Sequence, residues 1–169
     1  MRKTILQWIQ KIGGSLFFLG YIPLIPGTVG SLAIVIPLWF YRDSFDRYFS
    51  PQYAVPFCLF YFLFLAVSIF LSNGSKENFG SEDSTRIIID ECAGQIITFF
   101  LHPLSWRVLI LGFFLYRFYD IVKPFPVYKF EEIEDGVGVT MDDVAAGVMA
   151  NVSLFIILWI YHVIKARLL

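Results

Sequence analysis

Acidic side chains stand at the ends of apolar segments in three separate parts of the sequence. The five acids are Asp90, Glu91, Asp120, Asp142 and Asp143. Carboxylate oxygens without histidine or thiolate partners suit a hard cation, so they predict Mg²⁺ and not zinc. The two histidines, His102 and His162, lie elsewhere in the chain. All five acids are therefore candidate metal ligands and catalytic groups.

Two basic residues accompany these acids. Arg117, Asp120 and Lys123 are spaced three apart and so share one side of a helix. Mg²⁺-binding carboxylates beside cations are typical of sites that handle phosphate, where positioning and charge neutralisation supply most of the catalysis. Arg117 and Lys123 are therefore candidate phosphate-binding residues. Alternatively, the side chain of Lys123 extends to the membrane interface, as lysine side chains at helix ends more commonly do.

A turn rich in glycine, residues 25–31 with the sequence IPGTVGS, leads into an apolar segment. Free backbone N–H groups at the start of a helix can bind phosphate oxygens. The candidate substrate-binding residues of this turn are Gly27, Thr28, Gly30 and Ser31. The turn lacks the Gly-Lys-Ser/Thr ending of a P-loop, and a Pro-Gly pair before a helix is more often only a turn.

Several other phosphatase chemistries are excluded by the sequence. Neither cysteine has an arginine six positions later, since Phe64 follows Cys58 and Thr98 follows Cys92. No Asp-x-Asp pair precedes a threonine. A histidine-nucleophile enzyme needs histidines at the face that carries the acids, and the two histidines are predicted elsewhere. Water activated by a metal, or an unidentified protein nucleophile, remains.

The composition is that of an integral membrane protein. Hydrophobic residues make up 57% of the 169 residues and charged residues only 16%, whereas soluble domains are nearer a quarter charged. The mean hydropathy is +0.68. A net charge of −1 excludes a nucleic-acid binder with a broad basic face. Cys58 and Cys92 both lie in apolar stretches, which favours buried thiols over a disulfide.

Five apolar segments are candidates for membrane helices. Residues 54–72 and 144–164 are free of charge and long enough to cross about 30 Å of hydrocarbon. Residues 28–41, 87–101 and 106–121 are shorter than the usual crossing length of about 20 residues. The predicted fold is therefore all-α, with about four to five membrane helices, some of them short, in one polytopic membrane domain that spans the whole chain.

Two further segments complete this predicted fold. The first dozen residues carry Ile5, Trp8, Ile9 and Ile12 at helical spacing, which predicts an interfacial helix lying in the headgroup plane. Residues 123–143 form the one long polar stretch and are predicted to be a loop.

If all five segments cross and the N-terminus is cytoplasmic, all five acids and the turn at residues 25–31 fall at the cytoplasmic face. The distribution of basic residues favours this orientation only slightly. Any single acid is as well explained as a solvated helix end, where the dipole favours a negative charge. A purely structural bundle does not require all of them to gather at one face, so their convergence favours a functional site.

Four blocks of the sequence together resemble the phosphatidylglycerophosphatase A family. In order along the chain they are residues 20–32 (GYIPLIPGTVGSL), 90–94 (DECAG), 117–126 (RFYDIVKPFP) and 141–147 (MDDVAAG). The resemblance covers most of the chain and departs at one point. The family usually has a Gly-Gly-x-Gly-Ile-Met run before the paired aspartates, whereas residues 135–141 read DGVGVTM, so Asp135 replaces the first glycine.

The resemblance implies a Mg²⁺-dependent phosphatase of the bacterial inner membrane, multi-pass, with its active site facing the cytoplasm. It would convert the membrane phospholipid phosphatidylglycerophosphate into phosphatidylglycerol and inorganic phosphate. Lys123 and Arg117 would then neutralise phosphate charge, and Thr28 with the backbone of Gly27 and Gly30 would hold its oxygens.

Two other functions could use the same acidic cluster. A head-group transferase of the CDP-alcohol phosphotransferase type carries an Asp-Gly-x-x-Ala-Arg signature, but the Asp-Gly pair here, Asp135-Gly136, continues Val-Gly-Val-Thr. A divalent-cation transporter would need its carboxylates at mid-membrane depth, whereas these are predicted at one end. The sequence makes no prediction of oligomeric state.

Overall fold

A computed structural model describes residues 4–80 and 84–168, and every regular element in these residues is a helix. The six longer helices are α1 (Ile5–Gly14), α2 (Pro26–Phe40), α4 (Ala54–Ser72), α6 (Ile89–Thr98), α7 (Trp106–Val122) and α9 (Asp135–Leu168). The short α-helices are α3 (Arg42–Phe45), α5 (Ser75–Phe79) and α8 (Val127–Glu131). Three 3₁₀ turns lie at Leu19–Tyr21, Asp46–Phe49 and Pro51–Tyr53. The all-α prediction is confirmed.

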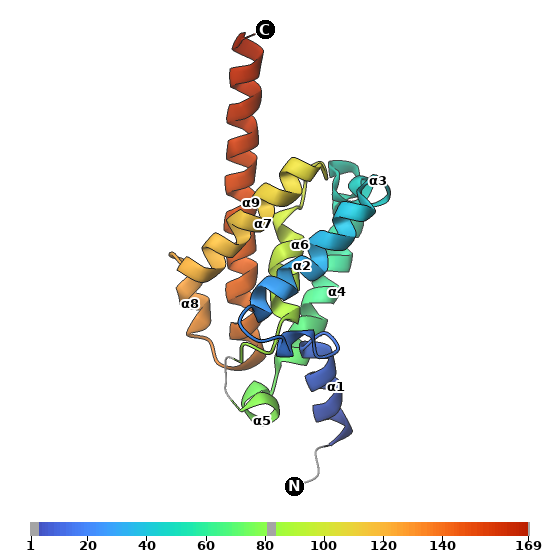
Figure 1. Cartoon of the computed structure of the whole chain (residues 1–169), viewed down its shortest axis with the longest axis vertical. Coiled ribbons are helices and arrows are strands. Elements are labelled where there is room, and N and C mark those ends of the chain that lie inside the picture. Colours follow the sequence, from blue (N-terminus) through green and yellow to red (C-terminus); the bar gives the residue numbers. More distant parts are fainter. Residues whose placement is uncertain (1–3, 81–83, 169) are drawn as a thin grey trace.

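Helix α6 is the centre of the bundle. It packs against α2, α4, α7 and α9 (Figure 1), and nearly all of its residues are buried. At about 1.5 Å per residue its ten residues rise only about 15 Å, half the thickness of the hydrocarbon layer. The predicted membrane segment at residues 87–101 is therefore a half-length helix enclosed by its neighbours, and it carries its N-terminal acids into the protein.

Small residues bring α6 and α9 into direct contact. A Cβ atom on Gly94 would collide with the backbone carbonyl of Asp143, and one on Gly147 would collide with the carbonyl of Gly94. The Thr98 hydroxyl donates to the Gly94 carbonyl at 2.9 Å within its own helix. This close approach places Asp143, in the third turn of α9, directly beside Gly94 of α6.

Helix α9 begins well before the predicted membrane segment at residues 144–164. It starts at Asp135 and continues for 34 residues, and α8 lies just before it. The prediction of one loop over residues 123–143 is therefore wrong. Glycines at 136 and 138 weaken a local helix signal, but they permit contact that a side chain would prevent: a Cβ on Gly136 would meet the backbone of α4, and one on Gly138 would meet the carbonyl of Ile133.

In the part of the chain that the structure describes, two helices are long and apolar enough to cross a membrane, namely Pro51–Ser72, which includes α4, and Asp135–Leu168. Only 22% of the most apolar stretch of each is buried, so apolar side chains face outward. Beyond Leu154 no described residue of α9 is buried, and this part projects from the bundle (Figure 1). Helices α2 and α7 match the shorter apolar segments at residues 28–41 and 106–121, but they are shorter than the two helices that are long enough to cross a membrane.

Helix α1 has an exposed apolar side and a polar anchor. Its capping box pairs Thr4 with Gln7, and Ile5, Trp8 and Ile9 are exposed. The buried Gln10 donates from Nε2 to the Phe70 carbonyl at the end of α4, 3.1 Å away. The predicted amphipathic helix is therefore present, and a polar side chain fixes it to the bundle.

Candidate active site

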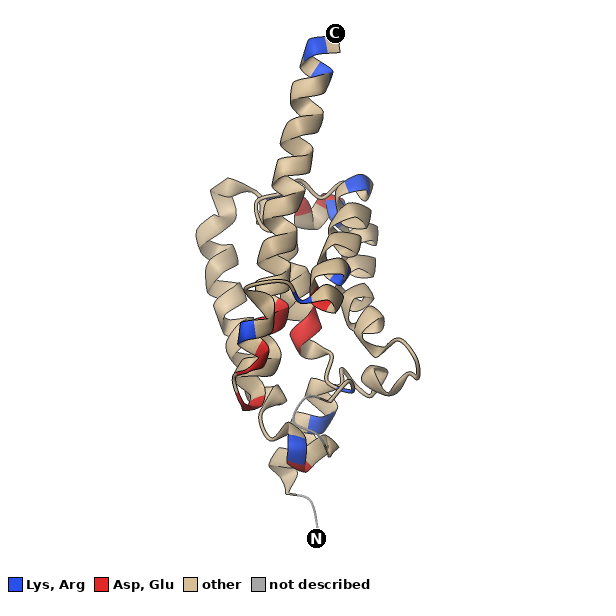
Figure 2. Cartoon of the chain, turned by 90° about the vertical axis from the view of Figure 1, so that its left-hand side faces the viewer, with Lys and Arg blue, Asp and Glu red and all other residues tan. Residues whose placement is uncertain are grey.

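A cavity of about 460 Å³ lies where the starts of α2, α6 and α9 meet the end of α7. Its lining includes all five predicted acids, both predicted cations and part of the predicted anion turn: Asp90, Glu91, Asp120, Asp142, Asp143, Arg117, Lys123, Gly27 and Thr28. Figure 2 shows that many of the acidic residues (red) lie in this part of the bundle, while the long upper stretch of α9 carries charged residues only near its end. Segments far apart in the sequence thus contribute to one polar cavity.

Asp90 and Glu91 occupy the first turn of α6. No side chain of the preceding N-cap residue, Ile88, bonds to this turn. Instead, Oδ1 of Asp90 accepts a hydrogen bond from the Glu91 amide at 2.8 Å. The unpaired amides at a helix start favour negative charge, so the local structure stabilises two carboxylates at the wall of the cavity.

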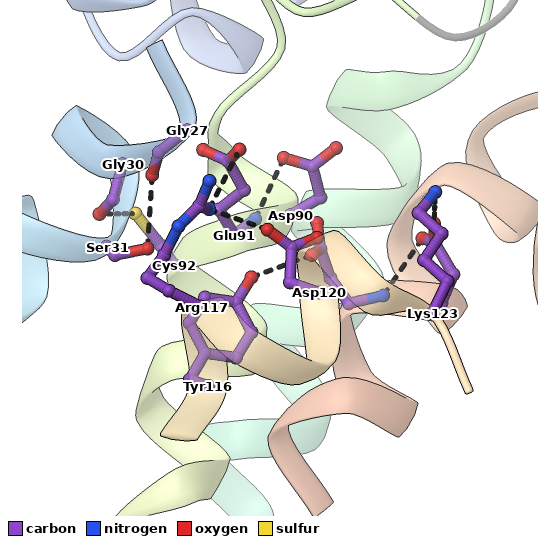
Figure 3. Close-up of polar contacts among 12 residues, drawn as sticks. Gly27, Gly30, Ser31, Asp90, Glu91, Cys92, Tyr116, Arg117, Asp120 and Lys123 are labelled. Carbon is purple, nitrogen blue, oxygen red and sulfur yellow. Dashed lines mark hydrogen bonds and ion pairs between the residues drawn. The ribbon is translucent and has the colours of Figure 1, made fainter. Parts of the chain in front are cut away.

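Arg117 connects α7 to α6. Its Nη1 lies 2.6 Å from Oδ2 of Asp120 and 3.7 Å from Oε1 of Glu91 (Figure 3). All three side chains are less than a fifth exposed. Arg117 and Asp120 lie on one side of α7, as their spacing predicted, and they form an ion pair. The same guanidinium also balances the acid of the neighbouring helix.

Lys123 turns back into the cavity from the end of α7. It has a left-handed backbone (φ 44°), and its Nζ lies 2.8 Å from Oδ2 of Asp142 and 2.9 Å from Oε1 of Glu131. Burial alone would lower the pKa of Lys123, but the hydrogen bonds to Asp142 and Glu131 outweigh burial and raise it above its usual value. The prediction that Lys123 faces the acids is therefore confirmed over the interfacial alternative. Glu131, on α8, is a contact that the sequence did not reveal.

Tyr116 is a second residue that the sequence did not reveal. It is completely buried, and its hydroxyl donates to Oδ1 of Asp143 at 2.7 Å. The amide of Asp143 in turn donates to Oδ1 of Asp142 at 2.9 Å. A buried tyrosine hydroxyl needs a partner, but the apolar segment around Tyr116 does not indicate which residue that partner is.

The start of α2 lies directly on Glu91. A Cβ atom on Gly27 would meet Oε1 of Glu91, and one on Gly30 would meet Oε2. The Ser31 hydroxyl donates to the Gly27 carbonyl at 3.1 Å, and the Cys92 thiol donates to the Gly30 carbonyl at 3.3 Å. Of the four residues predicted to bind phosphate, the structure places Gly27 and Thr28 at the cavity, whereas Gly30 and Ser31 lie outside its lining. Gly30 contacts α6 through Cys92, and the Ser31 hydroxyl bonds within α2.

The side chains that line the cavity suit a hard cation, since they offer carboxylate oxygens and include no histidine or cysteine. Asp143 is within electrostatic reach of Asp90, Glu91, Asp120 and Asp142. Within residues 4–80 and 84–168, however, no three Asp, Glu, His or Cys side chains are already arranged as a metal site. Arg117 and Lys123 engage three of the acids as ion pairs instead. The chemistry of the residues thus fits Mg²⁺, and the observed arrangement is one of ion pairs.

Comparison with known proteins decides the family. The phosphatidylglycerophosphatase A family profile matches residues 12–158, which include every residue of the cavity. The chain belongs to the phosphatidylglycerophosphatase A family.

Three curated relatives accompany this match. Phosphatidylglycerophosphatase A of Escherichia coli is 32% identical over 140 residues, covering 82% of this chain and 77% of the relative. That of Haemophilus influenzae is 36% identical over 103 residues, covering 60% of this chain and 63% of the relative. A Bacteroides thetaiotaomicron protein, provisionally named a phosphatidylinositol-3-phosphatase, is 32% identical over 160 residues, covering 91% and 96%. No solved structure matches the chain.

The departure from the usual pattern of the phosphatidylglycerophosphatase A family has a structural explanation. Asp135 has a left-handed backbone (φ 63°), which glycine adopts without strain and aspartate tolerates better than most residues. Its Oδ1 accepts a hydrogen bond from the Gly74 amide at 2.8 Å, and Asn73 accepts one from the Gly136 amide at 3.1 Å. The aspartate therefore replaces glycine where its side chain adds a contact between α9 and the end of α4.

Proposed function

We propose that the protein hydrolyses the terminal phosphomonoester of phosphatidylglycerophosphate, giving phosphatidylglycerol and inorganic phosphate, with Mg²⁺ as cofactor. The observation that carries this proposal is the single cavity that holds five carboxylates, a guanidinium and an ammonium group beside the start of α2. Membership of the family and the names of two relatives, both phosphatidylglycerophosphatase A, support the same reaction.

The acidic residues would hold the metal. Asp90, Asp142 and Asp143 would hold the ion, and Lys123, which pairs with Asp142 in this structure, would exchange that ion pair for one with the phosphate. Bound there, Mg²⁺ would supply positive charge against the phosphate and lower the pKa of water in the site.

The other residues would bind and orient the phosphate. Arg117 and Lys123 would neutralise its charge, and the first amides of α2, at Gly27 and Thr28, would bind its oxygens. In hydrolysis, water forms a bond to phosphorus and loses a proton to a carboxylate of the acidic set. The bond from phosphorus to the glycerol oxygen breaks, and that oxygen takes up a proton.

We also propose a multi-pass arrangement in the bacterial inner membrane, with the cavity facing the cytoplasm. Four helices, α2, α4, α7 and α9, would form the membrane bundle around α6, the first and third of them spanning a locally thinner layer. The outward-facing apolar side chains of α4 and α9 support this arrangement, as does the gathering of the acids at one end of the bundle.

Phosphate release by the purified protein tests the proposed reaction. Phosphatidylglycerophosphate, phosphatidylinositol 3-phosphate and phosphatidic acid are offered separately, each with Mg²⁺ and with a chelator. We expect release from phosphatidylglycerophosphate at the highest kcat/KM and only with Mg²⁺. Higher kcat/KM on the inositol lipid would transfer the proposal to the activity named for the Bacteroides relative. Absence of release from all three would favour cation transport or head-group transfer.

A further inference from the structure

A second cavity, of about 410 Å³, lies along the seam between α2 and α7. Its walls are entirely apolar and include Leu32, Ile36 and Trp39 from α2 with Ile110 and Phe114 from α7. Four of these five side chains are at least a third exposed. The seam is thus an open groove with no polar side chain in its walls.

The groove continues the polar cavity. The same two helices build both: α2 contributes Thr28 to the polar cavity and Leu32 to the groove, and α7 contributes Arg117 and Phe114 in the same way. Each pair is separated by three or four positions, which is about one helical turn. Along α2 the groove runs from Leu32 to Phe40, about 12 Å at 1.5 Å per residue.

We propose that this groove binds an acyl chain of the lipid whose phosphate occupies the polar cavity. The inference rests on the proposed function, because a lipid phosphate has its anionic head and its hydrocarbon chain joined through one glycerol. A substrate seated with its phosphate beside Thr28 and Arg117 directs its chain into an apolar slot that begins one turn away. Specificity for a lipid over a soluble phosphomonoester then comes from burial of the chain.

A comparison with another apolar cavity favours the groove between α2 and α7 as the binding site for the acyl chain. It has about 500 Å³ and lies on the opposite side of α2, with walls that include Ala33, Phe57 and Phe60. Its second wall is α4, which contributes nothing to the lining of the polar cavity. Bulk membrane lipid fills such a hollow equally well. The groove between α2 and α7 has both of its main walls on helices that line the polar cavity, whereas the other cavity takes only Ile96 from α6 beside its α2 wall.

Filling the groove tests the proposal kinetically. Ile36→Trp adds bulk inside it, and Leu63→Trp adds the same side chain at an exposed position of α4 that lines neither apolar cavity. We expect Ile36→Trp to raise KM for long-chain phosphatidylglycerophosphate about tenfold relative to KM for a short-chain analogue, with Leu63→Trp unchanged in this ratio. An equal ratio in the two variants would overturn the inference. Failure of the wild type on both substrates would refute the proposed function instead.

A binding measurement without turnover gives an independent result. In a variant with Trp8, Trp106 and Trp159 replaced by Phe, Trp39 in the groove is the one remaining tryptophan, and its fluorescence is excited selectively over that of the tyrosines. The probe is phosphatidylglycerophosphate with brominated acyl chains, added with chelator to vesicles of unbrominated phosphatidylcholine. We expect saturable quenching that excess unbrominated phosphatidylglycerophosphate reverses. Quenching that brominated phosphatidylcholine reproduces at the same concentration would show bulk lipid in the groove and overturn the proposal.

Discussion

The hydroxyl group of Tyr116 on α7 donates to Oδ1 of Asp143 on α9 across 2.7 Å, where both side chains are buried. This bond fixes one oxygen of an acid whose neighbours in the cavity are also acids. Tyr116 does not line the cavity, so it acts by positioning Asp143.

Tyr116→Phe should therefore lower kcat about tenfold with little change in KM for the lipid, because Asp143 loses its fixed orientation while the phosphate-binding cations remain. Stability should fall by about 1–3 kcal/mol, since a buried acceptor loses its donor. Steady-state kinetics and thermal unfolding in detergent measure the two effects.

The chain offers a matched control for this change. Tyr119 also connects α7 to α9, through a 2.7 Å hydrogen bond between its hydroxyl and that of Ser153, but it touches no acid. Tyr119→Phe should reduce stability and leave kcat unchanged. Equal loss of kcat in both variants would show that general loosening of α7 against α9 is responsible.

Arg117 should not be replaceable by lysine. Its guanidinium reaches both Glu91 and Asp120, and an ammonium group cannot present the same planar fork of donors. Arg117→Lys should lower kcat/KM about 10- to 100-fold. Arg107→Lys is the control, because Arg107 packs over the ring of the exposed Trp106 at the other end of α7. Activity retained in Arg117→Lys would show that the reaction does not need the planar fork of donors at this position.

The raised pKa of Lys123 predicts how its stabilising effect depends on pH. Burial opposes the charge, and the bonds to Asp142 and Glu131 more than compensate, so the folded protein holds this proton more tightly than the unfolded chain. The stabilisation is fully present below the ordinary lysine pKa of about 10.4 and is lost as pH rises through the higher folded value. The difference in thermal stability between wild type and Lys123→Met should then be constant from neutral to mildly alkaline pH. A difference that shrinks near neutral pH would contradict this assignment.

Replacements at Asp135 separate its backbone and side-chain effects. Asp135→Gly keeps the left-handed backbone and loses the bond to the Gly74 amide, at a cost of about 1 kcal/mol. Asp135→Ala loses the same bond and adds about 1–2 kcal/mol of backbone strain. Thermal unfolding should therefore rank wild type above Gly and Gly above Ala. An Ala variant as stable as the Gly variant would contradict the strain argument.

Local sequence patterns predicted which segments are helices better than where those helices begin and end. The uninterrupted apolar run at residues 54–72 coincides with α4, because composition alone decides such a helix. The start of α9 was missed because Gly136 and Gly138 disfavour a helix locally, and only contact with α4 and Ile133 explains them. The shortness of α6 likewise depends on the helices that enclose it.

The candidate site divides in the same way. Charge and spacing were enough to predict that the acids, Arg117 and Lys123 face one cavity. Tyr116 and Glu131 could not be found, because their partners lie 27 residues and eight residues away in the chain and meet them only in the folded protein. Gly30 and Ser31 looked identical in kind to Gly27 and Thr28, but in the folded protein the Gly30 carbonyl accepts from Cys92 of α6 and the Ser31 hydroxyl bonds back to Gly27 within α2.

The dependence of phosphate release on Mg²⁺ in Asp90→Asn tests the central claim most directly. The control is Glu132→Gln, an exposed acid just after α8 that does not line the cavity. With phosphatidylglycerophosphate as substrate, wild type and Glu132→Gln should show the same saturable Mg²⁺ dependence, whereas Asp90→Asn should need at least about tenfold more Mg²⁺ for half-maximal rate. An Asp90→Asn enzyme with the wild-type Mg²⁺ curve, or a wild type equally active in chelator, would contradict a metal held by these carboxylates.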